Sequence, residues 1–323
     1  MNRGFWDTLP KPFFILAPMY DVTDAPFRRI VSMCGAPNVW FTEFVSADGL
    51  TSTEGRARLM HHLTINKGEK PIVAQLFGAK PEKFIEAAEL LTELGFSGID
   101  INMGCPDKNI IKSGSCAALF KNPKLAQEII SATKQGAGGL PVSVKIRIGD
   151  TKVDWEDWIS ELLVAKPAAI SIHLRTRKEM SKVPAHWEIM NDIVQFIGKN
   201  TSEDNRPLVI GNGDVLTLAH AKQKVLDTGC DGAMIGRGVF QNPWVFAEDL
   251  PSAHSLKEKV KLLALHAELF EQHFTGIKPF ELLKRFYKIY INGFEGAAEL
   301  REQLYTANNS QELKTILNNH KLL

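Results

Sequence analysis

Short apolar runs alternate with amphipathic stretches from Phe13 to about Val245. Eight runs are rich in aliphatic and aromatic residues, and they span residues 13–18, 38–45, 71–77, 98–103, 141–147, 168–174, 207–212 and 231–236. Several are continuously apolar instead of alternating, which is typical of parallel strands that are covered on both faces. The pattern predicts a parallel sheet whose strands are joined by helices.

The stretches between these runs have the end signals of helices. Residues 81–95 begin with a proline and finish at Gly95, and residues 122–136 have Asn122 as a cap, Pro123 in the first turn and Gly136 beyond the last. Strand-helix units repeat eight times over roughly 230 residues, close to the roughly 250 of a closed barrel. We therefore predict a (β/α)8 TIM barrel in preference to an open doubly wound sheet.

The last part of the chain, from about Ser252, has helical periodicity and no strand candidate. Residues 256–274 and 279–294 are its two clearest amphipathic stretches. We predict a TIM-barrel domain over residues 1–250 followed by a small C-terminal all-helical domain over residues 251–323.

Basic and aromatic residues are interleaved in this tail. Lys278, Lys284, Arg285 and Lys288 lie among Phe280, Phe286, Tyr287 and Tyr290. Two interpretations stay open: a bundle whose aromatic residues form the core while its lysines are solvated, or a basic face that binds nucleic acid.

Composition narrows the class of protein. The 323 residues carry a formal net charge of +1, and the four cysteines include no CxxC pair, so neither a disulfide framework nor a zinc site is indicated. No apolar stretch reaches the length of a membrane span. We expect a cytoplasmic protein that uses no metal and associates with no membrane.

Polar residues stand at the carboxyl ends of the predicted strands, where TIM barrels place their active sites. In chain order they are Glu43, Gln75, Asn102 with Cys105, Lys145 with Arg147, His173 with Arg175, Asn212 with Asp214, and Gly236 with Arg237. Any one of them alone could be a core-edge residue that bonds to a loop carbonyl. Their coincidence at one end of the barrel predicts an active site.

Glycines at the last two strand ends favour a bound phosphate. The segments GNGD at 211–214 and IGRG at 235–238 follow strands seven and eight, the recurrent phosphate site of this fold, and Arg237 adds a guanidinium. No GxGxxG joins a strand to a helix, so a mononucleotide is favoured over a dinucleotide. With Lys145 and Gln75 reaching inward, the site resembles one for FMN. A Schiff-base role for Lys145 in an aldolase-type barrel is the alternative.

The successive motifs resemble those of one family, the tRNA-dihydrouridine synthases. They are LAPMYDVTDAPFR, TEFVSADGL, AQLFG, DINMGCPDKNIIKSGSCAALF, VSVKIRIG, IHLRT, IGNGD and MIGRGVFQNPWVF, and they run in order from about Phe14 to Trp244. NGFEGAAELREQL in the tail is similar to the family's helical domain. The resemblance implies an FMN-bound barrel that uses NADPH to reduce uridines of tRNA to 5,6-dihydrouridine, and we expect a monomer.

The resemblance also implies roles for individual residues. Cys105, at the position of the family's GCP cysteine, would give a proton to uracil C5 while the flavin delivers hydride to C6; a thiol with an ordinary pKa of about 8.5 is mostly protonated at neutral pH. Asn102 and Arg175 would hold the uracil, and Lys284 and Arg285 the tRNA. The implied flavin contacts are Pro18, Met19, Tyr20, Gln75, Lys145, His173, Asn212, Gly213, Asp214, Gly236 and Arg237. Cys116 stands where the family usually has glycine, and it is given no role.

Two other functions remain as alternatives. An FMN-dependent barrel acting on a free pyrimidine-like metabolite, similar to dihydroorotate dehydrogenase, would need no separate helical domain for RNA. An RNA-binding module without catalysis predicts a protein that carries no flavin.

Overall fold

The computed structural model describes residues 2–248 and 254–323. Contacts between residues divide the chain into two units, one of residues up to Thr23 with Pro37–Gly236, and one of Asp24–Ala36 with Arg237–Leu323. The predicted domain boundary at residues 250 and 251 lies outside the described residues.

The first unit is a closed barrel of eight parallel strands. In sheet order β1 lies beside β8, and β7, β6, β5, β4, β3 and β2 follow; a parallel bridge between Ile15 and Val39 closes the ring. The strands are β1 (Phe13–Leu16), β2 (Trp40–Ser46), β3 (Ile72–Phe77), β4 (Gly98–Asn102), β5 (Val142–Arg147), β6 (Ala169–His173), β7 (Leu208–Asn212) and β8 (Gly232–Ile235). The predicted TIM barrel and its eight strands are confirmed.

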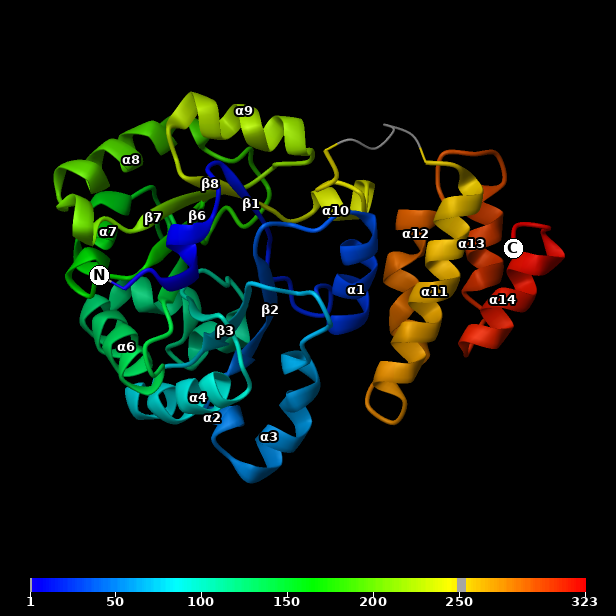
Figure 1. Ribbon diagram of the computed structural model, residues 1–323, viewed down its shortest axis with the longest axis horizontal. Coiled ribbons are helices and arrows are strands. Elements are labelled where there is room, and N and C mark those ends of the chain that lie inside the picture. The colour runs from blue at the N-terminus through cyan, green and yellow to red at the C-terminus, as the bar shows by residue number, and fades with distance from the viewer. Residues whose placement is uncertain (1, 249–253) are drawn as a thin grey trace. The chain divides into compact units, whose positions relative to one another are not determined.

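Helices surround this barrel in Figure 1. The long ones are α4 (Pro81–Glu93), α6 (Pro123–Gly136), α7 (Trp155–Val164), α8 (Met190–Lys199) and α9 (Leu218–Thr228). Shorter α-helices are α2 (Ala47–Leu50), α3 (Thr53–Leu59) and α5 (Lys108–Lys112), and 3-10 turns occupy Gly4–Thr8, Met60–Leu63, Cys116–Lys121, Trp187–Ile189 and Glu203–Asn205.

The ends of α6 test the capping prediction. Asn122 caps the helix as predicted, since its side-chain oxygen accepts a hydrogen bond from the Leu125 amide at 3.3 Å. The prediction that Gly136 lies beyond the helix is wrong, because Gly136 is the last helical residue. A Cβ there would lie 2.1 Å from the carbonyl oxygen of Ile85 in α4. This glycine therefore permits close packing of two helices and does not terminate one.

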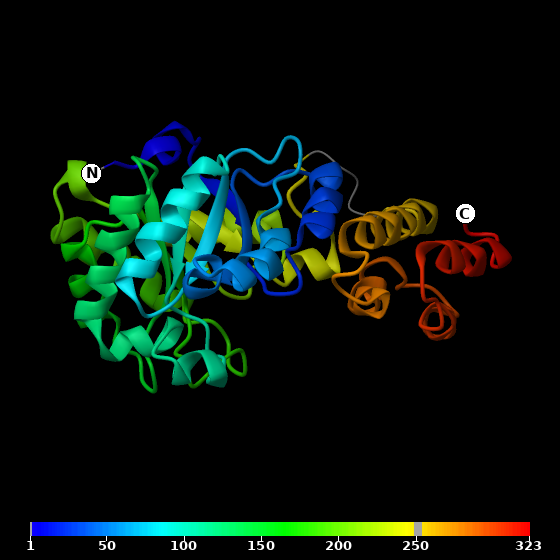
Figure 2. The same cartoon turned by 90° about the horizontal axis from the view of Figure 1, so that it is seen from below.

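The second unit is all helical. Its elements are α1 (Ala25–Cys34), α10 (Gly238–Gln241), α11 (Leu256–Phe274), a 3-10 helix (Phe280–Phe286), α12 (Tyr287–Tyr290), α13 (Ala297–Leu304) and α14 (Ser310–Asn319). Helices α11 to α14 are the yellow-orange to red ribbons of Figures 1 and 2. The residues predicted as a helix at 279–294 form a 3-10 turn and a single α-turn instead. None of the described helices is long and apolar enough to cross a membrane.

Aromatic side chains form the core of this unit. The rings of Phe27 and Phe286 stack with centroids 5.0 Å apart, and Phe286, Tyr287 and Tyr290 are buried while Arg285 and Lys288 are exposed. The aromatic residues of the tail therefore serve packing, as the bundle interpretation predicts, and the cations remain on the surface.

Candidate active site

The strand register places the predicted polar residues on neighbouring strands at the carboxyl end of the barrel. Asn102 on β4 pairs with Lys145 on β5, Arg147 with His173 on β6, and His173 with Asn212 on β7. Because alternate residues of a barrel strand face the interior, Asp100 and Asn102 share one face of β4. The sequence prediction of convergence at one rim therefore matches the register.

A chain of buried hydrogen bonds leads from the barrel interior to Cys105. The Asp100 carboxylate accepts from Ser143 Oγ at 2.6 Å and from Gln75 Nε2 at 2.7 Å. Gln75 Oε1 accepts from Asn102 Nδ2 at 3.0 Å, and Asn102 Oδ1 accepts from the Cys105 amide at 2.9 Å. The turn that carries the thiol is therefore anchored to three strands of the barrel.

The thiol environment of Cys105 differs from that of an isolated cysteine. A hydrogen bond with the Cys116 thiol is the main cause that lowers the pKa of Cys105 to about 7, against the opposing effect of burial. Cys116 is fully buried, and burial raises the pKa of its own thiol well above the usual value. Cys116 takes up a positive φ of 54°, a conformation that suits the glycine usual in the family. The second thiol, which the sequence analysis left without a role, therefore acts on the first.

Lys145 projects toward the barrel interior from β5 while keeping partial exposure to solvent. Its ammonium donates to Asn212 Oδ1 at 3.1 Å, and Asn212 Nδ2 donates to the Met234 carbonyl at 2.9 Å. Burial, followed by repulsion from Arg147, lowers the pKa of Lys145 to about 8. Burial also raises the pKa of Asp100 to about 6, and Lys145 partly offsets that rise.

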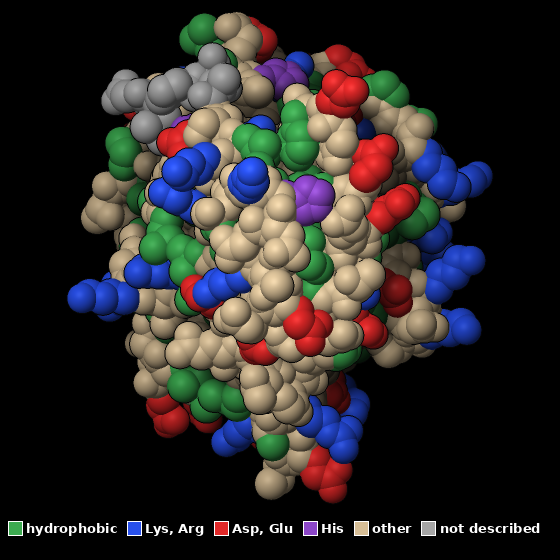
Figure 3. Space-filling view, turned by 90° about the vertical axis from the view of Figure 1, so that its right-hand side faces the viewer, with side chains coloured by type: hydrophobic (Ala, Val, Ile, Leu, Met, Phe, Trp, Pro, Cys, Tyr) green, Lys and Arg blue, Asp and Glu red, His purple; other side chains and the backbone are tan. Residues whose placement is uncertain are grey.

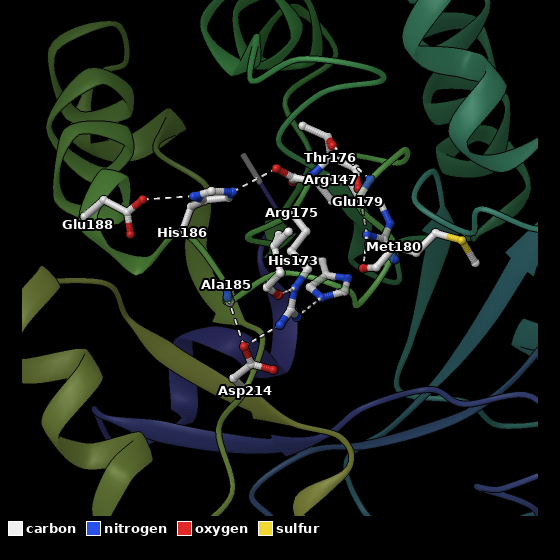
Figure 4. Close-up of polar contacts among 11 residues, drawn as sticks. Arg147, His173, Arg175, Thr176, Glu179, Met180, Ala185, His186, Glu188 and Asp214 are labelled. Carbon is white, nitrogen blue, oxygen red and sulfur yellow. Dashed lines mark hydrogen bonds and ion pairs between the residues drawn. The ribbon is translucent and has the colours of Figure 1, made fainter.

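Arg175, itself buried, lies in a partly buried network with His173 and Asp214 (Figure 4). Its Nε donates to the Val183 carbonyl at 2.6 Å, Nη1 donates to His173 Nε2 at 3.2 Å, and Nη2 is paired with the Asp214 carboxylate. Three of its five N–H donors are thus engaged. Arg175 is 2% exposed, so any uracil contact of the kind the resemblance implies would be made from beneath the surface.

Arg147 joins the loops that follow β4 and β6. Its Nε donates to the Gly104 carbonyl at 2.7 Å, and its Nη1 donates to the carbonyls of Thr176 at 3.1 Å and Met180 at 3.0 Å (Figure 4). Burial lowers the pKa of Arg147 to about 10. The sequence placed Arg147 at a strand end, but nothing in the sequence indicated that it would bridge two loops.

Beyond Arg147, the loop after β6 is tied by acidic groups. Glu179 accepts from the Thr176 amide at 2.7 Å and contacts His186 Nε2 at 3.1 Å, while His186 Nδ1 contacts Glu188 at 2.9 Å (Figure 4). The hydrogen bond with Glu179 raises the pKa of His186. The segment that carries Arg175 is therefore held at several points.

The loop after β1 carries Pro18, Met19 and Tyr20. Tyr20 is 52% exposed, and its ring centroid lies 5.7 Å from that of His62. Beneath it the fully buried Glu43 accepts from the Asp21 amide at 2.5 Å and bonds His62 Nδ1 at 2.8 Å. In the sequence Glu43 stands out only as a strand-end residue, and no sequence feature points to His62, which lies outside the strands.

The glycines at the carboxyl ends of β7 and β8 differ in what the surrounding structure requires of them. A Cβ on Gly211 would lie 2.4 Å from the Trp187 ring, so that glycine makes room for the indole, whose Nε1 donates to the Gly213 carbonyl at 2.7 Å. Gly213 has φ of +130° and Asp214 of +53°. At Gly236 a Cβ would make only ordinary contacts with Ala17 and Met19, at 3.6 Å. Gly236 is thus not required by the protein's own packing.

The remaining predicted site residues belong to the second unit. Arg237 is exposed and immediately precedes α10. Arg285 lines a surface pocket of about 450 Å³ with Phe240, Gln241, Lys288, Ile289 and Asn292. Lys284, which is half-buried, is not among the lining residues.

Comparisons with known proteins point to one family. A family model described as Dihydrouridine synthase (Dus) matches residues 15–322. A probable tRNA-dihydrouridine synthase of Staphylococcus aureus (strain MRSA252) is 45% identical over 321 residues, 98% of this chain and 95% of that protein. A probable tRNA-dihydrouridine synthase 2 of Bacillus subtilis (strain 168) is 44% identical over 321 residues, 98% of this chain and 96% of that protein.

Solved structures resemble the fold at low sequence identity. A 2-naphthoyl-CoA reductase complex matches with a TM-score of 0.57 and 11% identity over 72% of this chain, and histamine dehydrogenase from Rhizobium sp. 4-9 with 0.54 and 12% over 79%. The matches cover 49% and 48% of those chains, so the matched part of this chain corresponds to about half of each. At such identity the likeness supports the barrel fold.

Proposed function

Since the chain belongs to the dihydrouridine synthase family, we propose that it reduces the C5–C6 bond of uridines in tRNA, with FMN as its flavin, NADPH as reductant and Cys105 as proton donor. The observation that carries this proposal is the rim geometry: Asn102 fixes the Cys105 amide at 2.9 Å and pairs in register with Lys145. The proposed thiol acid, in the turn that follows β4, thereby lies next to the carboxyl end of β5, which carries the proposed flavin-binding cation.

The residues at the rim fit a flavin. Ser171 Oγ, on the strand next to Lys145 and paired with it in register, is buried without a hydrogen-bond partner in the described part of the chain. Lys145 has three N–H donors, of which Asn212 accepts one. An orphaned hydroxyl and a partly free ammonium suit the polar edge of an anionic ring, and the missing side chain at Gly236, which the protein's own packing does not require, suits the close approach of a phosphate. Gln75, His173, Asn212, Gly213, Asp214, Pro18, Met19, Tyr20 and Arg237 complete the proposed set.

A bound flavin supplies the hydride for uracil C6. The protein's own part is to give a proton to C5, and Cys105 is the proposed donor. Its pKa of about 7, set mainly by Cys116, leaves a substantial protonated fraction at neutral pH, and an acid whose pKa lies near the working pH is the most effective. The anchored amide of Cys105 keeps the thiol at one place on the rim.

The helical unit supplies the proposed tRNA contact. Arg285 and Lys288 place two cations beside the apolar Phe240 and Ile289 in one pocket, which suits a phosphate with its sugar or base. Among the described residues drawn in Figure 3, Lys and Arg side chains are interspersed with Asp and Glu on the visible face. We therefore propose recognition of RNA shape through a few phosphate contacts, made by a monomeric enzyme. The alternative of a free metabolite as substrate leaves this unit, which the family match includes, without a role.

Replacing the proposed acid tests the function. Unmodified tRNA, NADPH and the flavin-loaded enzyme are incubated, and dihydrouridine is quantified in digested RNA by mass spectrometry. We expect Cys105→Ala to lower the rate by about 10² to 10⁴-fold, the usual contribution of general acid catalysis, while NADPH oxidation persists. Cys230→Ala removes a buried thiol elsewhere and should keep the normal rate. Normal dihydrouridine formation by Cys105→Ala would remove this residue from the mechanism.

A further inference from the structure

Asp100 lies at the start of the hydrogen-bond chain that ends on the Cys105 turn, and neither the resemblance nor the proposed function gives it a role. It is fully buried in β4 and two residues before Asn102, on the same face of the strand. Its carboxylate contacts Gln75 and Ser143 on the neighbouring strands. Both hydrogen-bond partners of Asp100 are neutral, and burial outweighs the attraction of Lys145, so its charge carries a desolvation cost that favours a specific purpose.

The two ends of this chain have fixed polarity. A carboxylate only accepts hydrogen bonds, and a backbone N–H only donates. Between these ends lie two side-chain amides, those of Gln75 and Asn102, each of which presents either its oxygen or its NH₂ group. Because Asp100 accepts from Gln75 Nε2, the oxygen of Gln75 faces Asn102, and the oxygen of Asn102 is left to hold the turn.

The side-chain oxygen of Asn102 holds the Cys105 turn through two hydrogen bonds. Asn102 Oδ1 accepts from the amides of Gly104 at 3.1 Å and Cys105 at 2.9 Å. If the side-chain amide of Gln75 were reversed, its NH₂ group would face the NH₂ group of Asn102, and two donors cannot bond each other. Reversing Asn102 as well would remove that conflict, but its NH₂ group would then face the backbone N–H groups of Gly104 and Cys105. The amide order is therefore decided at Asp100.

We propose that Asp100 is a positioning residue for Cys105, fixing through the amides of Gln75 and Asn102 the turn that presents the thiol. This inference rests on the proposed role of Cys105 in the reaction. Its consequence for the free protein is independent of flavin and RNA, because the contact between the Cys105 and Cys116 thiols depends on the same turn. The charged and titratable groups that interact with Cys105 are Cys116, Asp107, Arg147 and Lys145, and Asp100 is not among them.

The test is the pH dependence of Cys105 alkylation by iodoacetamide, followed by peptide mass spectrometry in protein without RNA. The other three cysteines are buried and should react slowly, and the peptide that contains Cys105 reports its alkylation separately from theirs. Asp100→Leu removes the acceptor for Gln75. We expect the alkylation midpoint to rise from about 7 toward the ordinary value of about 8.5, which slows the reaction at pH 7 about 10-fold.

Asp100→Asn is the matched conservative variant. Its amide oxygen can still accept from Gln75 while its NH₂ group donates to the Ser143 hydroxyl, so the order of the chain survives without the charge. We expect its midpoint to stay at the wild-type value. Ser143→Ala, which removes the other bond to Asp100, should likewise leave it unchanged.

Melting temperatures separate positioning from simple stabilisation. A lower melting temperature in Asp100→Leu with an unchanged midpoint would overturn the proposal, and so would an equal shift in Asp100→Asn, which would show that charge is what Cys105 senses. If Asp100→Leu does not fold, Gln75→Met cuts the chain one link later and should give the same upward shift; a wild-type midpoint there overturns the proposal. An upward-shifted midpoint in Asp100→Leu together with normal dihydrouridine formation would instead support the positioning of Cys105 and count against its proposed role as the acid.

Discussion

Two buried aspartates at opposite ends of the barrel differ in what surrounds them. Asp231, before β8 at the amino-terminal end, bonds Lys11 Nζ at 2.6 Å, Arg206 Nη1 at 3.0 Å and the Val209 amide at 2.8 Å. Asp100, near the carboxyl end, bonds the neutral Gln75 and Ser143. The Asp231 carboxylate is thus neutralised by two cations, whereas the hydrogen-bond partners of Asp100 are neutral side chains, one of which, Gln75, it orients.

The difference separates structural from functional use of the same residue type. At Asp231 the ion pairs with Lys11 and Arg206 and the hydrogen bond from the Val209 amide tie the start of β8 to the starts of β1 and β7. At Asp100 the buried charge carries a cost, seen in a pKa raised to about 6 chiefly by burial. Stability given up near an active site is typical of groups that position other groups. We therefore expect the amino-terminal end of the barrel to serve folding and the carboxyl end to serve the proposed chemistry.

The largest expected effect is a pH-dependent penalty at Asp100. Its folded pKa, about 6, exceeds the ordinary 3.8, so the folded state binds the proton more tightly, and stability falls as pH rises between these values. Asp100→Asn removes this dependence. Relative to wild type, the free energy of unfolding of Asp100→Asn should therefore increase by about 2 kcal/mol between pH 4 and pH 6. Urea unfolding of both proteins at pH 4, 5, 6 and 7 measures the difference.

A difference that stays constant across this pH range would mean that Asp100 titrates as an ordinary exposed carboxyl, and the comparison with Asp231 would lose its basis. Ser143→Ala serves as the control. Because it removes a hydrogen bond that stabilises the charged form of Asp100, it should make the pH dependence steeper.

The next effect concerns the lysines of the two ends. Lys145→Met should weaken FMN binding by the apoprotein about 10 to 100-fold, the amount that one lost charge-assisted hydrogen bond of about 1.5–3 kcal/mol implies. Lys11→Met makes the same chemical change beside Asp231 and should leave flavin affinity unchanged. Fluorescence titration of FMN into both apoproteins measures this, and equal affinities would contradict the flavin role of Lys145.

Much of the barrel was predictable from the sequence because its signals are local. Eight apolar runs and the capping residues of α6 are properties of short segments, and family motifs located Cys105, Lys145 and Asn102. The role of Gly136 was assigned wrongly, since the Ile85 carbonyl that excludes a side chain there belongs to another helix. A contact between two segments that lie far apart in the sequence cannot be predicted from the residues of either segment alone.

The same limit applies to the site. Asp100 sits inside the apolar run 98–103, two positions before the residue that the sequence did single out. The strand period of two places both side chains on one face, which was the available signal. The carbonyl partners of Arg147 and Arg175 could not be foreseen, because they belong to the backbone of loops whose course is set only by the folded chain.

The smallest expected effect is that of Lys11→Met on stability. The Lys11 side chain is 54% exposed, and after its removal Arg206 and the Val209 amide still bond Asp231. An exposed ammonium in an ion pair contributes about 0–1 kcal/mol, because water already stabilises it and its long side chain must be ordered. We therefore expect urea unfolding at pH 7 to show a loss below about 1 kcal/mol, diminishing in 1 M salt, where the Debye length falls to about 3 Å. A loss above about 2 kcal/mol that persists in salt would show that Asp231 needs both cations, as a buried charge does. The amino-terminal end would then resemble the carboxyl end in depending on an exact set of partners.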